Sequence, residues 1–426
     1  MNEPPDVIAW QLTTKAVPDS PRDTTMKLIN QLDDWLNGRI SAPLPMAEIL
    51  QAFHDYGKQF VDKALLQRLD GVRQRLAASQ LLANTWIGAA LATLLDKYDG
   101  KYDYYSYLAL DLLNWEENAT GNEALLDWRL TLLTFDIMRF EFAALSGNEN
   151  WLPRIPSDEK LASMRGRRLL RAMQAALERQ QLTPHNVESG VITEISNLWS
   201  QIDARMSETD RLRLNYSLLP VDKVHDEYLF LRILQTFETV FSWLAVSLNQ
   251  VIRLGTTDIH QSHHLIERCH QRLCEASLLF PLLSSLRVEA FRDFRTHTEG
   301  ASAIQSHSYK TVESLCRTPS KERINSIAYI SVPEVRNRVL QQSETIDSVY
   351  LNMGQTASIS PSDLAVFSQA MNAFEFELKK WRQSHYGIAV KMLGVSPGTG
   401  YTEGTPYLNE VRHIAVFEAN KIQEIK

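Results

Sequence analysis

The sequence predicts an all-α protein. Apolar residues recur at helical spacing in nearly every long segment, and no run of alternating β-branched residues lies between turn residues. The 426 residues include 44% hydrophobic and 22% charged side chains, an ordinary composition for a globular protein with one large core or two domains. We therefore expect a protein built from helices.

Charge and cysteine content narrow the class of partner. The net charge of -7 disfavours nucleic acid, because a phosphate backbone needs a basic face. No apolar run reaches the ~18 residues needed to span a bilayer, and MNEPPDVIAW lacks the pattern of a secretory signal. Cys269, Cys274 and Cys316 form no metal-binding pattern and suit a reducing compartment. We expect a cytoplasmic protein with no nucleic-acid and no membrane partner.

The N-terminal half contains three segments of two kinds. Residues 1–23 carry four prolines and little apolar periodicity, which predicts a loose leader. Residues 24–99 and 123–213 have apolar positions at helical spacing and are expected to form amphipathic helices.

The C-terminal half contains two longer helical patterns. Residues 225–252 predict one long helix, and Ser362 and Asp363 can cap another that runs to Gly394. A polar, glycine-rich loop is expected at 395–408.

His385 lies on an apolar face of the second long helix. Trp381, Ile388 and Met392 share that face because each is one or two helical turns away from His385. A neutral imidazole in a dry pocket is a suitable axial ligand for haem iron. A hydrogen-bonded core histidine is the alternative, and the spacing alone does not decide between them.

Four separate blocks resemble the tryptophan 2,3-dioxygenases, in the order found in that family. The blocks are YYSYL with LDLL (104–113), HDEYLF with Gln235 and Glu238 (225–238), FRDFR with GAS and QS (291–306), and WRQSH with MLG and GTG (381–400). In the last block a threonine follows the histidine by fourteen residues, 399 minus 385, as it does in the family. The resemblance covers about half of the chain.

The resemblance implies how the chain is divided. Residues 100–114 and 224–426 would form a helical-bundle core that binds haem. Residues 24–99 would be an N-terminal helical extension, and residues 115–223 a large helical insertion. Haem b as cofactor, dioxygen as co-substrate and a free aromatic amino acid as substrate are implied in the same way.

The resemblance also implies the roles of individual residues. His385 would ligate the haem iron, with Trp381, Gly398 and Gly400 beside the cofactor. Arg295 would pair with the substrate carboxylate, which suits the two-pronged geometry of a guanidinium; a surface ion pair is the alternative. Thr399 would contact the amino-acid head group, where neighbouring glycines allow a close backbone approach.

Further positions would complete the substrate pocket. Phe230 and Phe291 match aromatic wall residues, and Ser302 matches a serine on the distal side of the haem. Tyr104, Tyr107 and Leu108 match residues that a neighbouring subunit contributes, which implies a homo-oligomer, either dimer or tetramer. Ordinary helix packing is the alternative for these three.

One position departs from the family. Leu234 stands where the dioxygenases have a histidine that bonds the indole nitrogen, an interaction worth about 1 kcal/mol. The leucine leaves a drier pocket, which also suits a ring-substituted tryptophan or a tyrosine. His297 would supply a polar group instead if it does not face away.

Two reactions and one binding role are therefore considered. The leading hypothesis is dioxygenation of the indole ring of L-tryptophan or a derivative, giving an N-formylkynurenine-type product. The alternative is a haem-dependent monooxygenase or peroxygenase that hydroxylates an aromatic amino acid in secondary metabolism. A haem or amino-acid sensor without turnover is the third.

Overall fold

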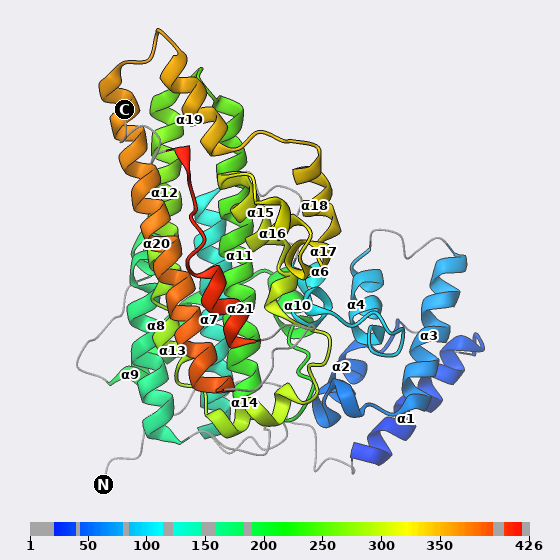
Figure 1. Cartoon of the computed structure of the whole chain (residues 1–426). Coiled ribbons are helices and arrows are strands. Elements are labelled where there is room, and N and C mark those ends of the chain that lie inside the picture. The colour runs from blue at the N-terminus through cyan, green and yellow to red at the C-terminus, as the bar shows by residue number, and fades with distance from the viewer. Residues whose placement is uncertain are drawn as a thin grey trace.

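The computed structural model describes residues 21–39, 43–79, 85–113, 122–145, 158–182, 190–394 and 404–419. Every regular element in these ranges is a helix, so the predicted all-α class is confirmed. The longest described helices are α11 (His225–Leu254) and α20 (Pro361–Leu393), and α12 (Ile259–Ser277) packs against both. Figure 1 shows these three helices running along the length of the molecule.

The first four described helices enclose a small apolar core. They are α1 (Pro21–Leu36), α2 (Met46–Tyr56), α3 (Lys63–Ala78) and α4 (Trp86–Leu95). Leu32, Ile49 and Leu65 are fully buried in this core, which is separate from the apolar core around α11. In Figure 1 the four helices stand to one side of the long-helix bundle.

The N-terminal helices are fastened to the segment that precedes α11. Gly57 has φ +80°, and a Cβ there would lie 2.9 Å from the backbone of Asp222, so only glycine allows this approach. The neighbouring Lys58 donates its backbone N–H to the carbonyl oxygen of Pro220 over 2.9 Å. Its side chain forms a fully buried ion pair with Asp96 at 2.6 Å.

Four helices fill the middle of the chain and share the core of the long helices. They are α7 (Glu123–Leu145), α8 (Glu159–Arg179), α9 (Val191–Arg205) and α10 (Glu208–Tyr216). Helix α7 packs against α11, and α8 packs against α7, so their apolar side chains belong to one continuous cluster with those of α11 and α12. The division of the chain into extension, insertion and core stays a prediction.

Short helices connect and cover the long ones. They are α5 (Tyr104–Tyr107), α6 (Leu110–Leu113), α13 (Phe280–Leu283), α14 (Val288–Arg295), α15 (His307–Cys316), α16 (Lys321–Ile324), α17 (Ile327–Ile330), α18 (Pro333–Leu340), α19 (Ile346–Gln355) and α21 (Thr405–Val411). Of these, α14, α15 and α21 matter most for the site described below.

Proline sets the start of two helices differently from the prediction. Helix α1 begins at Pro21, inside the predicted leader 1–23, because proline fits the first helical turn, where no N–H is needed. The first twenty residues lie outside the described residues. Helix α21 begins at Thr405 with a proline in its first turn, so the end of the predicted loop 395–408 is helical.

The N-cap of α20 also differs from the prediction. Ser360, and not Ser362 or Asp363, is the capping residue, and its Oγ accepts the N–H of Asp363 over 3.1 Å. Pro361 occupies the first turn, so the helix starts earlier than expected. The predicted end is confirmed, since Gly394 follows the last helical residue with φ +59°.

Helix α11 is long and apolar enough to cross a membrane by length and composition. Within its most apolar window, however, 72% is buried inside the protein. That degree of burial is typical of a core helix, and it agrees with the position of α11 in the centre of Figure 1.

The N-terminal turn of α11 carries charges that are buried and paired. The carboxylate of Asp226 accepts Nη2 of Arg165 over 2.7 Å and the backbone N–H of Arg287 over 2.7 Å. Arg165 also pairs with Glu141, which lies 3.0 Å from Nε2 of His225. This group, which we call the Arg165 network, joins α7, α8 and α11, and all four of its charged or titratable side chains are almost completely buried.

A second buried group fixes the next two turns of α11. Nε of Arg232 donates to Asp136 on α7 over 2.8 Å, and its Nη1 donates to Ser217 and to Gln235, each over 2.8 Å. Gln235 in turn donates to the carbonyl oxygens of Leu108 and Ser217, each over 2.9 Å. Because buried polar groups must keep these partners, the helix has one permitted rotation about its axis.

Replacing Arg165 with alanine should destabilise the protein strongly. The change would leave the carboxylates of Glu141 and Asp226 buried without their cation, a loss of about 3–5 kcal/mol in the free energy of unfolding. Urea unfolding followed by circular dichroism measures this loss. Arg167→Ala, on the exposed side of the same helix, is the matched control and should change stability by less than about 0.5 kcal/mol; an equally small loss for Arg165→Ala would contradict the role of the network.

Candidate functional site

One large cavity lies among α11, α14, α15, α20 and α21. Its volume is about 240 Å³, far more than the ~10–15 Å³ needed to hold a single water molecule. Most of its wall is apolar, and a few polar side chains face it at separate places. A cavity with this kind of lining suits a small organic ligand that is held by a few specific polar contacts.

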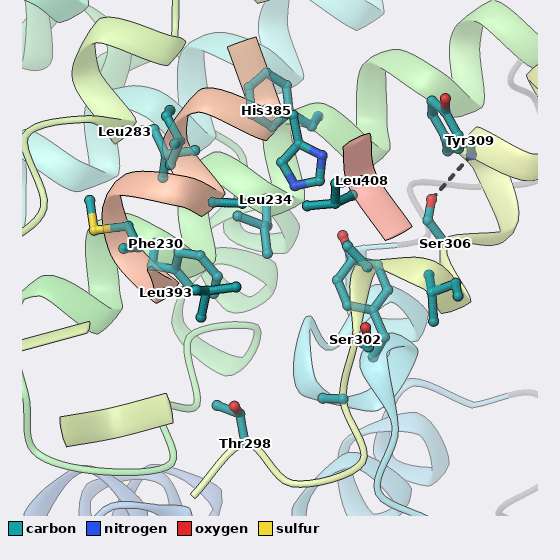
Figure 2. A pocket seen from close by; sticks show the side chains of 18 of the residues that line it. Phe230, Leu234, Leu283, Thr298, Ser302, Ser306, Tyr309, His385, Leu393 and Leu408 are labelled. Atoms are coloured by element: carbon teal, nitrogen blue, oxygen red, sulfur yellow. Dashed lines mark hydrogen bonds between the residues drawn. The ribbon is translucent and has the colours of Figure 1, made fainter. Parts of the chain in front are cut away.

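His385 faces the cavity from α20. Figure 2 shows its imidazole pointing from the helix toward the side chains of Leu234 and Leu408. Neither ring nitrogen has a hydrogen-bond partner among the described residues, and burial lowers the pKa of this histidine to about 4. The imidazole is therefore neutral at neutral pH and offers a free lone pair to the cavity.

Aromatic side chains surround His385 on the side of the core. The ring of Trp381, one turn earlier on α20, lies 5.4 Å from the imidazole, measured between ring centroids. Phe241 and Phe280 lie 5.0 and 5.4 Å from the same indole ring. These contacts hold the Trp381 ring in one orientation and keep water away from the histidine.

Arg295 faces the same cavity from the C-terminal end of α14. Its side chain is partly buried, and burial lowers the pKa of the guanidinium, which stays charged at neutral pH. Phe291 and Phe294, on the same helix, form an edge-to-face pair at 5.4 Å and contact Phe230 on α11. The cation thus stands at one end of an aromatic wall.

Phe230 and Leu234 extend this wall along α11. They are one turn apart, and both line the cavity, as do Phe237 and Glu238 one turn further on. No histidine takes the place of Leu234: His297 is not among the cavity residues and instead stacks edge-on against Phe60, with ring centroids 5.0 Å apart. The interpretation that His297 faces away therefore holds in the structure.

Tyr104 and Tyr107 line the cavity of their own chain. Tyr104 donates its hydroxyl to Glu238 over 3.0 Å, and Tyr107 donates to Glu227 over 3.2 Å. These two bonds tie α5 to α11 within one chain. The contribution of these residues to the pocket of a neighbouring subunit stays a prediction. Leu108 does not reach the cavity; it is fully buried beside the tyrosines, and its carbonyl oxygen accepts Gln235.

Ser302 lines the cavity opposite His385, as Figure 2 shows. Its neighbour in the cavity wall, Thr298, lies at the far end of the same view. The predicted head-group residues Gly398, Thr399 and Gly400 lie outside the described residues.

The sequence pattern did not predict a role for the carboxyl group of Glu238. It accepts hydrogen bonds from Tyr104 and Ser308, and burial raises its pKa. It therefore holds its proton more readily than an exposed glutamate, at a place where the cavity is otherwise apolar. Helical spacing could have predicted that Glu238 faces the cavity, since it follows Leu234 by one turn and Phe230 by two on the same helical face.

The described residues fit a haem group. Haem needs a neutral axial ligand, flat apolar walls and a site from which water is excluded. His385 provides the first, since its ring is uncharged and without a hydrogen-bond partner in the described part of the chain. Trp381, Phe237 and Leu234 provide apolar walls around it.

The site therefore belongs to an all-helical protein whose buried neutral histidine and cationic anchor share one apolar cavity. A comparison with family models finds no match. Three curated relatives are tryptophan 2,3-dioxygenases. That of Shewanella woodyi is 25% identical over 276 residues, covering 55% of this chain and 96% of its own. Those of Erythrobacter litoralis and a Bradyrhizobium species are 22% and 21% identical and cover 46% and 50% of this chain, with 88% and 90% of their own.

The chain is a distant homologue of the tryptophan 2,3-dioxygenases. Its relatives match over nearly their whole length, while about half of this chain has no counterpart in them.

Proposed function

We propose that this protein is a haem-dependent oxygenase that acts on the ring of a free aromatic amino acid, most simply L-tryptophan or a derivative of it. The observation that carries the proposal is that His385 and Arg295 face one apolar cavity from different helices. The relatives named tryptophan 2,3-dioxygenase support the reaction class.

The residues of the chain would perform four tasks. His385 would hold the haem iron through a ring nitrogen, and Arg295 would bind the substrate carboxylate with two charge-assisted hydrogen bonds. Phe230 and Phe291 would orient the aromatic ring, and the apolar walls would exclude water. Haem, when bound, supplies the iron at which dioxygen is activated. Burial raises the pKa of Glu238, so its carboxyl group binds a proton at a higher pH than an exposed glutamate does.

The decisive experiment measures the product. Reduced, haem-loaded protein is incubated under air with tryptophan, ring-substituted and N-methylated tryptophans, and tyrosine, and mass spectrometry follows each compound. A gain of two oxygen atoms supports dioxygenation, which is the leading proposal. A gain of one would support the hydroxylating alternative, which the apolar Leu234 at the distal position favours, and no gain with any compound would reject an oxygenase.

His385→Ala should give a folded protein that no longer retains haem. The mutation removes the proposed iron ligand but places alanine, a good helix former, in the middle of α20. Absorption in the Soret region measures haem content, and circular dichroism checks the fold. His413→Ala removes an exposed histidine and should keep the haem; a normal haem spectrum in His385→Ala would refute the ligand assignment.

Arg295→Ala should raise the KM for the amino acid by about tenfold or more, because a charge-assisted pair contributes about 1.5–3 kcal/mol. Haem content should stay the same. Steady-state kinetics on haem-loaded protein gives the KM, and Arg292→Ala, an exposed arginine on the same helix, is the matched control. The carboxylate role fails if both variants have the KM of the wild type.

Leu234→His should favour substrates with a free indole N–H. The new imidazole can accept that N–H, an interaction worth about 1 kcal/mol, so kcat/KM for L-tryptophan relative to 1-methyltryptophan should rise about fivefold. Leu234→Met keeps the position apolar and should leave the ratio unchanged. An unchanged ratio in Leu234→His would mean that this position does not select the substrate.

A further inference from the structure

One part of the cavity wall carries charged side chains that have no role in the proposed function. Lys310 on α15, Arg382 on α20 and Tyr407 on α21 all line it there. Behind them lie Glu313 and Arg323, so that four charged side chains meet in a small, largely buried volume. We call Lys310, Glu313, Arg323 and Arg382 the Lys310 cluster.

The Lys310 cluster contains three cations and one carboxylate. Glu313 accepts Nη2 of Arg323 over 2.7 Å and the hydroxyl of Tyr329 over 3.0 Å, and Nη2 of Arg382 lies 3.7 Å away. The three cations hold the pKa of Glu313 well below its usual range. Among the described residues, Glu313 is the one carboxylate within ion-pair distance of Arg323 and Arg382, and no carboxylate lies within that distance of Lys310.

Lys310 is the cation with the weakest partners. It is 2% exposed, and its hydrogen bond to the hydroxyl of Tyr407 is long, at 3.5 Å. Its Nζ lies 5.3 Å from the centre of the Tyr309 ring, a cation–π contact that only partly replaces hydration. Burial, together with the two nearby arginines, lowers the pKa of this lysine to about 7, although Glu313 opposes the shift. A buried ammonium at a cavity wall is costly unless an anion reaches it.

We propose that the Lys310 cluster is an anion-binding subsite, in which Lys310 and Arg382 bind a carboxylate group of a ligand in the cavity. This inference rests on the proposed function, which provides two sources of a carboxylate: the propionates of haem and the acid group of the amino acid. The propionate is the favoured source, because Arg382 lies three residues before His385 on α20 and Arg295 already faces the cavity from another helix.

The test is a thermodynamic cycle that combines removal of the Lys310 charge with removal of the propionate charges of the ligand. Haem-free wild type and Lys310→Met are titrated with haemin and with haemin dimethyl ester, in which both propionates are blocked, and the Soret band gives each Kd. Wild type should prefer haemin, and Lys310→Met should reduce that preference about tenfold through weaker binding of haemin alone. Lys321→Met removes an exposed lysine and should keep the preference.

The haem-free variants separate a binding role from a structural one. Lys310→Met removes surplus buried charge, so the melting temperature without ligand should stay equal or rise. Equal weakening of haemin and its ester, together with a lower melting temperature, would overturn the subsite in favour of a structural lysine. Lys310→Gln provides a second, polar replacement, and it should behave in the same way as Lys310→Met.

A second cycle identifies the source of the carboxylate. Binding of L-tryptophan and of tryptamine, which lacks the carboxylate, to haem-loaded protein is followed by the shift of the haem spectrum. If Lys310→Met abolishes the preference for L-tryptophan but not the preference for haemin, the subsite holds the substrate. If it changes neither preference, the subsite is overturned. A wild type that binds neither haemin nor its ester would overturn the proposed function and, with it, the subsite.

Discussion

The rest of the site depends on how α11 is held. Its polar residues are buried, and each is paired with a different part of the chain: Asp226 with Arg165 on α8, Arg232 with Asp136 on α7, and Glu227 with the backbone N–H groups of Val221 and Asp222. Because a turn of the helix about its axis would break all of these pairs at once, its rotation is fixed. The opposite face, which starts at Phe230, is thereby directed into the cavity.

The same constraint explains why charged side chains are unevenly distributed around the cavity. Polar residues of α11 that point away from the cavity find partners in neighbouring helices, so its cavity face can stay apolar apart from Glu238. Charged side chains come from other elements: Arg295 lies on α14, and the Lys310 cluster lies on α15, α16 and α20. The neutral ring of His385 lines the same cavity. An apolar site with cations at separate edges suits a flat, largely apolar ligand that carries acid groups on its periphery.

Sequence periodicity predicted the helical class and both long helices, because their apolar spacing is strong and continuous. It also placed His385 on the face that meets the cavity, since neighbours at helical spacing share a side of the helix whatever the tertiary fold. Lys310 could not be found in this way. The proposed role of Lys310 depends on Arg323 and Arg382, which are distant in sequence, and on Glu313, the single carboxylate of the cluster. The start of α20 was missed for a local reason, because Ser360, Ser362 and Asp363 are all good capping residues and Pro361 decides among them.

The tyrosines of α5 show how the additional helices bear on the site. Tyr107 reaches the cavity while its hydroxyl donates to Glu227, whose pKa burial raises to about 8. The backbone N–H groups of Val221 and Asp222 donate to Glu227, and the backbone of the same two residues contacts Gly57 of the N-terminal helices. A displacement of those helices would therefore move the acceptor of Tyr107 and, with it, part of the cavity wall. A change in the N-terminal helices would consequently reach the site through one buried carboxyl group, although none of their described residues lines the cavity.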